Sequence, residues 1–86
     1  MNNSNIAILG CGNIGSAIAK GLIKSRLYHA ADITLTRRKI EHIQSLRDSG
    51  FTITADNKEA VNKAEVIILA VTPGQINELL DDIAPQ

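Results

Sequence analysis

Four short runs of apolar and β-branched residues recur along the chain, and apolar residues follow a different spacing between them. The runs predict strands at residues 6–9, 33–36, 51–54 and 66–71. In the intervening segments, apolar residues recur three and four positions apart, as they do in amphipathic helices. Strand and helix therefore alternate, which is typical of an α/β protein with an open parallel sheet and right-handed crossovers. We expect the strand order 3-2-1-4, with helices flanking the sheet.

The same spacing predicts which residues of each helix face the sheet. They are Ile14, Ala17, Ile18, Gly21 and Leu22 in the first helix, and Ile40, Ile43 and Leu46 in the second. They are Ala60, Val61 and Ala64 in the third helix, and Ile76, Leu79, Leu80 and Ile83 in the last. The strand at 66–71 is almost continuously apolar, so we expect a central strand that is covered on both faces.

Helix boundaries are marked by capping residues. Gly50 is expected to end the second helix, and Asp56 with Glu59 to cap the third. Thr72, Pro73 and Gln75 match the N-cap, the first helical position and the reciprocal capping position of the last helix.

A glycine motif joins the first strand to the first helix. Its three glycines, Gly10, Gly12 and Gly15, match the pattern G-x-G-x-x-G in the strand–turn–helix context of a dinucleotide site. Gly10 allows a tight turn, Gly12 lets a pyrophosphate approach the backbone, and Gly15 lets the helix pack closely on the strand. Together with the expected strand order 3-2-1-4, this motif indicates a Rossmann-type fold with an incomplete second half. The alternative is a glycine-rich turn without a ligand. The remaining candidate cofactor-binding residues of the loop are Cys11, Asn13 and Ile14.

The end of the second strand indicates which dinucleotide binds. An acidic residue is expected about 20 residues beyond the fingerprint when a ribose hydroxyl is bound. Thr36 stands there instead, and Arg37 and Arg38 follow. A hydroxyl and two guanidinium groups suit a 2′-phosphate, because arginine offers planar, charge-assisted donors. We therefore expect NADP(H) rather than NAD(H). The alternative is a solvated basic turn at residues 37–39.

Composition limits the remaining functions. The 86 residues suffice for one domain, and nine basic and nine acidic residues cancel, so nothing points to nucleic acid. The polar first five residues do not resemble a signal peptide, and no apolar run approaches the ~20 residues that span a membrane. The single cysteine, Cys11, cannot form an internal disulfide, which suits the cytoplasm. We expect Cys11 to fill the loop, and we expect His29 in a loop and His42 exposed on a helix. No catalytic pair and no metal cluster is predicted.

Several segments together resemble the N-terminal domain of the pyrroline-5-carboxylate reductase family. They are the glycine motif with Asn13, the T-R-R turn at 36–38, the segment D-N-K-E-A-V at 56–61 and the segment I-I-L-A-V-T-P at 67–73. The resemblance implies that Asn57 lies near the adenosine ribose, and that Ala70, Val71 and Pro73 lie along the nicotinamide. Thr72 departs from the family, which usually has lysine there.

The resemblance implies an NADPH-dependent oxidoreductase that reduces a small cyclic imine to L-proline. It also implies that residues 1–86 are a dinucleotide-binding domain, and that a helical domain for substrate binding and dimerisation is missing. We therefore expect this chain to be inactive alone and its exposed sheet edge to favour self-association. Two alternatives stay open. One is the NADP-binding domain of a deazaflavin-dependent NADP oxidoreductase, and the other is an NADP-binding module without catalysis.

Overall fold

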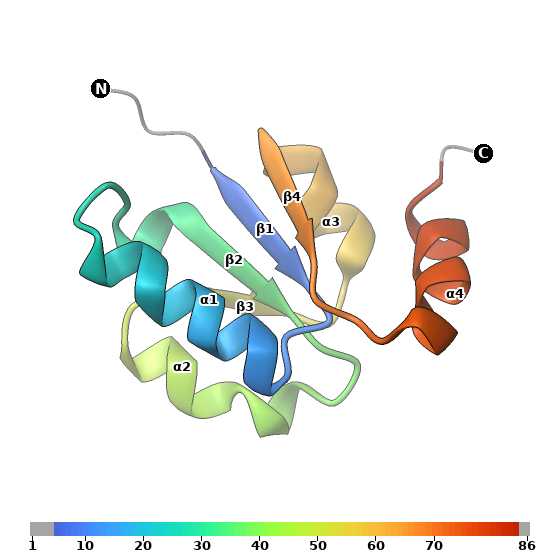
Figure 1. Cartoon of the computed structure of the whole chain (residues 1–86), viewed down its shortest axis with the longest axis horizontal. Helices are drawn as coiled ribbons and strands as arrows, with labels where there is room; N and C mark the ends of the chain where they lie inside the picture. The colour runs from blue at the N-terminus through green and yellow to red at the C-terminus, as the bar shows by residue number, and fades with distance from the viewer. Residues whose placement is uncertain (1–4, 85–86) are drawn as a thin grey trace.

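The predicted strands form one sheet in the order β3-β2-β1-β4, and all three neighbouring pairs are parallel (Figure 1). The computed structural model describes residues 5–84, apart from the side chain of His42. The predicted exposure of His42 therefore lies outside the described part. The expected fold class and strand order are both confirmed.

Helices and strands alternate as predicted, with two short 3₁₀ helices added. The strands are β1 (Ile6–Leu9), β2 (Ile33–Thr36), β3 (Thr52–Thr54) and β4 (Val66–Leu69). The α-helices are α1 (Asn13–Lys24), α2 (Gln44–Asp48), α3 (Asn57–Lys63) and α4 (Pro73–Ile83). The 3₁₀ helices are η1 (Ala30–Asp32) and η2 (Ile40–His42). The second predicted helix is thus a 3₁₀ turn followed by a short α-helix, and Gly50 ends it with a φ of +101°.

The two faces of the sheet carry separate apolar clusters, because successive side chains of a strand point to opposite faces. Ile6 and Ile8 of β1 pack on the side of α1 and α2, together with Leu35 of β2. Ala7 and Leu9 pack on the side of α3 and α4, against Ala60 and Leu79. All four β1 side chains are therefore buried, as expected for the strand at the centre of a parallel sheet.

The buried face of α1 differs from the prediction. Ile14 is 71% exposed, and Ala17 and Gly21 also face away from the core. Gly15 and Ala19 are buried instead, and Ile18, Leu22 and Ile23 pack partly against the core. The helix is turned so that its smallest residues meet the sheet. A Cβ on Gly15 would lie only 3.3 Å from Ile8 Cγ2, so the helix approaches β1 more closely than an isoleucine stripe would allow.

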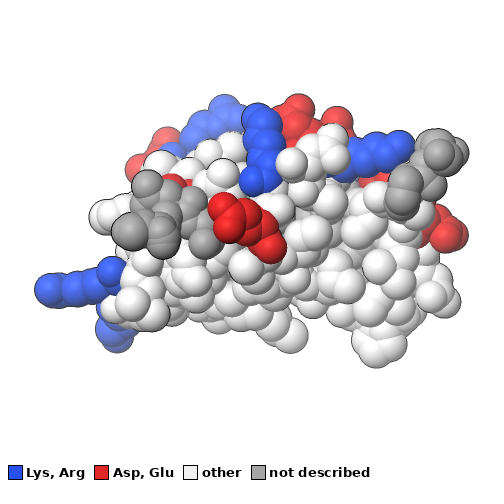
Figure 2. Space-filling model, turned by 90° about the horizontal axis from the view of Figure 1, so that it is seen from above, with Lys and Arg blue, Asp and Glu red and all other residues white. Residues whose placement is uncertain are grey.

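The prediction that β4 is a covered central strand is wrong for this chain. β4 pairs with β1 on one side, and within residues 5–84 no strand pairs with its other side. Val66, Ile67 and Leu69 are between 37% and 45% exposed. The apolar run therefore reaches the surface. Figure 2 shows a broad area without charged side chains on the face seen from above, with most charges along one rim.

Capping at the last two helices follows the prediction closely. Asp56 accepts a hydrogen bond from the backbone N–H of Glu59 at 3.1 Å, at the start of α3. Thr72 and Gln75 form a capping box at α4, with Pro73 in the first helical position. Helix α4 packs on α3, away from the centre of the sheet (Figure 1). Leu80, predicted to face inward, is 44% exposed, so the α4 stripe is narrower than predicted.

Candidate functional site

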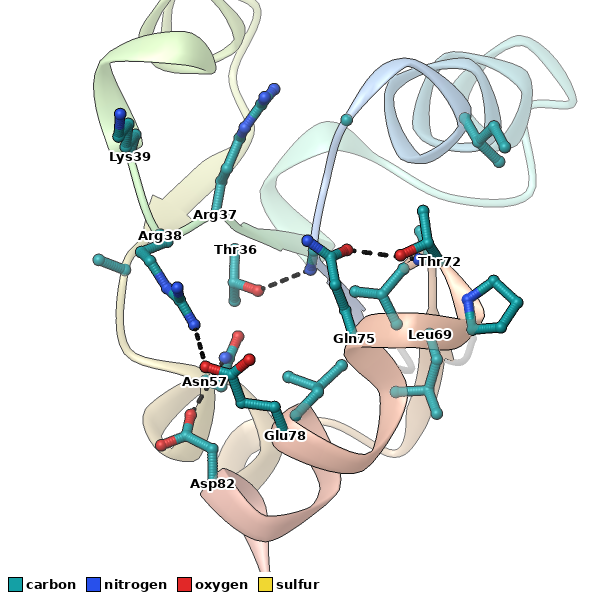
Figure 3. A pocket seen from close by; sticks show the side chains of 18 of the residues that line it. Thr36, Arg37, Arg38, Lys39, Asn57, Leu69, Thr72, Gln75, Glu78 and Asp82 are labelled. Carbon is teal, nitrogen blue, oxygen red and sulfur yellow. Dashed lines mark hydrogen bonds and ion pairs between the residues drawn. The ribbon is translucent and has the colours of Figure 1, made fainter.

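A cleft of about 1330 Å³ opens at the carboxyl ends of the strands. The turns that follow β1, β2, β3 and β4 line it, and one side of α4 closes its lower wall (Figure 3). In open α/β sheets ligands bind outside these strand ends. The volume exceeds the roughly 300–1,000 Å³ of an ordinary small-molecule pocket, so the cleft has room for a large ligand.

The first two glycines of the motif lie in opposite surroundings. Gly10 has a φ of +77°, and a Cβ there would collide with Cγ1 of Val71. A Cβ on Gly12 would meet nothing within 4 Å, and Gly12 lines the cleft. Gly10 is therefore required by the fold itself, whereas the space beside Gly12 is open to a ligand. An open space of this kind would allow the close approach of a pyrophosphate.

The beginning of α1 offers backbone donors to an anion. Gly12 is the N-cap residue and supplies no side-chain cap, and the first turn contains no acidic residue. The first N–H groups of a helix have no partner within the helix, and the helix dipole is positive at this end. Since Asn13 and Ile14 line the cleft, these donors lie at its wall. This arrangement suits phosphate oxygens.

Thr36 holds the glycine turn in place. The residue is 1% exposed, and its hydroxyl oxygen accepts a hydrogen bond of 3.1 Å from the backbone N–H of Gly10. Its carbonyl oxygen accepts a second bond from the N–H of Cys11. The residue therefore ties the end of β2 to the turn after β1, and it lines the cleft from this position.

The two arginines that follow point in different directions (Figure 3). Nη1 of Arg37 donates to the carbonyl oxygen of Cys11 at 3.5 Å, toward the glycine turn. Nη2 of Arg38 lies 2.6 Å from Oε1 of Glu78 on α4. Both arginines line the cleft, but the predicted joint cradle of Thr36, Arg37 and Arg38 is not formed in this conformation.

Asn57 lines the cleft and carries a buried acceptor without a partner in the described part of the chain. Its Nδ2 donates to Oδ2 of Asp82 at 3.1 Å, whereas its buried Oδ1 has no partner among the described residues. Buried polar atoms in proteins are nearly always hydrogen-bonded. Asn57 lies at the cleft, and its contact with a ribose stays a prediction.

Eleven of the thirteen predicted cofactor-binding residues line the cleft. They are Gly10, Gly12, Asn13, Ile14, Thr36, Arg37, Arg38, Asn57, Ala70, Val71 and Pro73. Cys11 and Gly15 are buried and do not line it. The Cys11 side chain is fully buried in the core and its Sγ lies 3.5 Å from Oγ of Ser16, so it fills space as predicted.

The acidic side of α4 was not among the predicted site residues. Glu78, Asp81 and Asp82 all line the cleft, at spacings of three and four residues that place them on one side of the helix. That spacing was visible in the sequence, but nothing there indicated that α4 would turn this side toward the arginines.

Other chemistry is not indicated by the described residues. Among residues 5–84, no group of three or more His, Cys, Asp or Glu side chains could hold a metal ion. His29 is exposed in a loop before η1 and does not line the cleft. No helix in the described part of the chain is long and apolar enough to cross a membrane.

Comparison with known proteins identifies the family of the chain. A family model described as "NADP oxidoreductase coenzyme F420-dependent" matches residues 5–86. The chain is 52% identical to pyrroline-5-carboxylate reductase 2 of Dictyostelium discoideum, over 95% of this chain and 28% of that protein. It is 41% identical to pyrroline-5-carboxylate reductase 1 of the same organism, over 94% of this chain and 15% of that protein. The resemblance to this group of reductases is confirmed.

A solved structure has the same fold as this chain and the same enzyme name as the relatives above. The pyrroline-5-carboxylate reductase from Coxiella burnetii superposes with a TM-score of 0.83 and 35% sequence identity, over 95% of this chain and 32% of that one. The chain thus spans less than a third of the length of each relative named here. The family description names NADP, in agreement with the predicted cofactor.

Proposed function

The chain belongs to the family described as "NADP oxidoreductase coenzyme F420-dependent", and from this membership we propose that it binds NADP(H) in the cleft at the strand ends. The observation that carries the proposal is the open space beside Gly12 at the uncapped start of α1. The pyrophosphate would lie against this helix end, and the ribose of the adenosine would contact Asn57. Ala70, Val71 and Pro73 would line the nicotinamide end.

We further propose that residues 1–86 are the dinucleotide-binding domain of a pyrroline-5-carboxylate reductase. The support is the 52% identity to a protein of that name, of which this chain covers 28%. NADPH would supply the hydride when bound, and this domain would hold the cofactor so that its nicotinamide faces the imine carbon of a small cyclic substrate. Residues that bind the imine would lie outside this domain, so the chain alone would be inactive. A cytoplasmic location is part of the same proposal.

Titration of NADPH and NADH into the chain tests cofactor binding. We expect NADPH to bind more tightly, and Arg37→Ala to reduce that preference, because a guanidinium beside the cleft attracts the 2′-phosphate. Gly12→Val serves as the blocked control, since its side chain would fill the open space. Equal affinities for both cofactors that Arg37→Ala leaves unchanged would show that the 2′-phosphate assignment is wrong.

A second candidate function comes from the family description, which names coenzyme F420. An F420-dependent oxidoreductase would use the same NADP site but a different second substrate. A longer protein that carries this domain would separate the two. Consumption of NADPH with pyrroline-5-carboxylate supports the imine reductase, and NADPH-dependent reduction of F420 supports the alternative. NADPH binding without either reaction would indicate a non-catalytic module.

We also propose that two copies of the chain associate through β4. The support is an apolar strand that is paired on one side only among residues 5–84, with Val66, Ile67 and Leu69 partly exposed. Unpaired strand edges of this kind tend to pair with another chain.

A further inference from the structure

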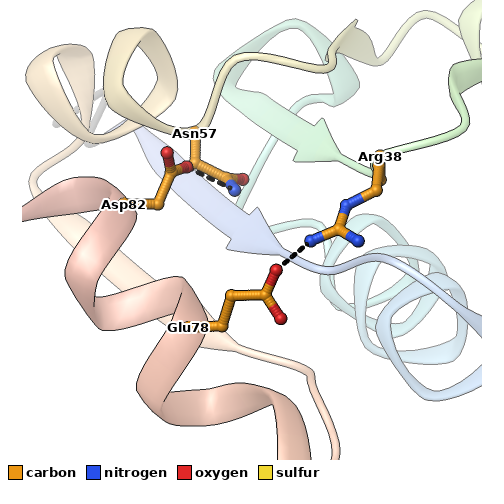
Figure 4. A network of polar contacts seen from close by, with 4 residues as sticks. All are labelled: Arg38, Asn57, Glu78 and Asp82. Atoms are coloured by element: carbon orange, nitrogen blue, oxygen red, sulfur yellow. Dashed lines mark hydrogen bonds and ion pairs between the residues drawn. The ribbon is translucent and has the colours of Figure 1, made fainter.

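Two residues that are predicted to contact the cofactor, Arg38 and Asn57, are bound by carboxylates of helix α4. Glu78 of α4 forms an ion pair with Arg38, at 2.6 Å between Oε1 and Nη2 (Figure 4). One turn further along α4, Asp82 accepts the hydrogen bond of 3.1 Å from Asn57. The acidic side of α4 therefore lies against the end of the cleft where a 2′-phosphate or a ribose hydroxyl would bind.

We propose that Glu78 is a specificity-determining residue that lowers the preference for NADP(H) over NAD(H). This inference rests on the proposed cofactor site. The carboxylate of Glu78 occupies the Nη2 donor of Arg38, so a phosphate that binds the same guanidinium would lie near this carboxylate, and two anions repel at short distance. A ribose hydroxyl is affected differently, because it can donate a hydrogen bond to the carboxylate. Thr36 stands at the end of β2 where an acidic residue would bind a ribose hydroxyl, and Glu78 supplies such a carboxylate from α4 instead.

The effect of Glu78 is expected to be moderate. The side chains of Arg38 and Glu78 are 82% and 67% exposed, and pairs so exposed contribute little to folding. The charge of Glu78 matters more for a ligand than for the fold, because a phosphate brings a charge of about −1.5 to −2 to the same guanidinium. Removing the carboxylate charge should tighten NADPH binding by about three- to tenfold at low ionic strength.

Asp81 provides a matched control on the same helix. It also lines the cleft, but it makes no ion pair with Arg38, and no other ion pair of Asp81 occurs in the described segment. Asp81→Asn therefore removes the same charge from the same helix without releasing Arg38. Comparison of Glu78→Gln with Asp81→Asn therefore separates the effect of the contact with Arg38 from the effect of the negative charge of α4.

The test compares the dissociation constants of NADPH and NADH for the wild type and for the single variants Glu78→Gln, Asp81→Asn and Arg38→Ala. The double variant that combines Arg38→Ala with Glu78→Gln is measured as well. We expect Glu78→Gln to raise the NADPH:NADH affinity ratio more than Asp81→Asn does. The gain should disappear in the Arg38→Ala background and shrink at high salt. Circular dichroism of each variant checks that the fold is kept.

Two kinds of result would contradict the proposed role of Glu78. An unchanged ratio in Glu78→Gln, or equal changes in Glu78→Gln and Asp81→Asn, overturns the role of Glu78 while leaving the cofactor site intact. Failure of the wild type to bind either cofactor overturns the proposed function itself, and the role of Glu78 with it.

Discussion

Gly10 and Gly12 are two residues apart in one motif, yet they depend on the absence of a side chain for different reasons. At Gly10 the backbone has a φ of +77° and the neighbouring Val71 leaves no room for a Cβ. At Gly12 the space is open and faces the cleft. One glycine therefore serves the fold, and the other serves the ligand.

These surroundings predict opposite results for two substitutions. Gly10→Ala should lower the free energy of unfolding by about 1–3 kcal/mol, because it combines a strained conformation with a clash. Gly12→Val should leave the unfolding free energy within about 1 kcal/mol of the wild type but abolish NADPH binding, since surface changes cost little. Urea denaturation and a cofactor titration on both variants measure the two effects. A Gly12→Val variant that binds NADPH normally would contradict the placement of the pyrophosphate.

At the residue scale, glycines and strand-end side chains could be predicted from sequence because their chemistry is local. The backbone requirement at Gly10 follows from the motif, and so does the position of Arg37 at the end of β2. The partners of the side chains could not be predicted. Glu78 lies 40 residues from Arg38, and only the packing of α4 on α3 brings the two together.

Among the elements, the N-cap of α3 offers a direct measurement of local stability. Asp56 accepts from the Glu59 N–H at 3.1 Å, and Asp56→Ala removes this acceptor. The unfolding free energy should fall by about 1 kcal/mol, which is the usual cost of losing such a cap. Asp56→Asn keeps a capping oxygen and serves as the control. Equal losses in both variants would mean that the charge, rather than the cap, stabilises the start of α3.

The order of the elements and the caps of α3 and α4 followed from the sequence, because capping residues and apolar periods are local signals. The face that α1 buries did not follow. Isoleucine at position 14 fits an apolar stripe, but Gly15 can approach β1 more closely, so packing against the sheet rotated the helix. Similarly, the apolar run of β4 predicted a strand that is covered on both faces, but most of its side chains are exposed in this chain.

At the scale of the whole molecule, the parallel sheet gathers the site. Because β1, β2 and β4 run in the same direction, the turns after them meet at one edge, and residues from Gly10 to Pro73 line a single cleft. This convergence could be predicted once the strand order was known. The same topology leaves β4 at the margin of the sheet, with its apolar side chains partly exposed.

The exposed edge predicts that the chain associates with itself as its concentration rises. Ile67 lies in the middle of β4 and is 40% exposed. A lysine on an edge strand opposes pairing with another strand, because the charge would be buried in the joint sheet. Sedimentation velocity should therefore show a concentration-dependent increase in mass for the wild type and a smaller or no increase for Ile67→Lys.

A second variant distinguishes pairing at β4 from general stickiness of the surface. Leu27 is 78% exposed in the loop after α1, far along the chain from β4, and Leu27→Lys adds the same charge there. If β4 forms the interface, Leu27→Lys should sediment like the wild type, while Ile67→Lys stays monomeric. Equal suppression by both lysines would indicate that net charge, rather than the strand edge, controls association. A wild-type chain that remains monomeric at high concentration would rule out the interface, since the unpaired edge then has no measurable tendency to pair.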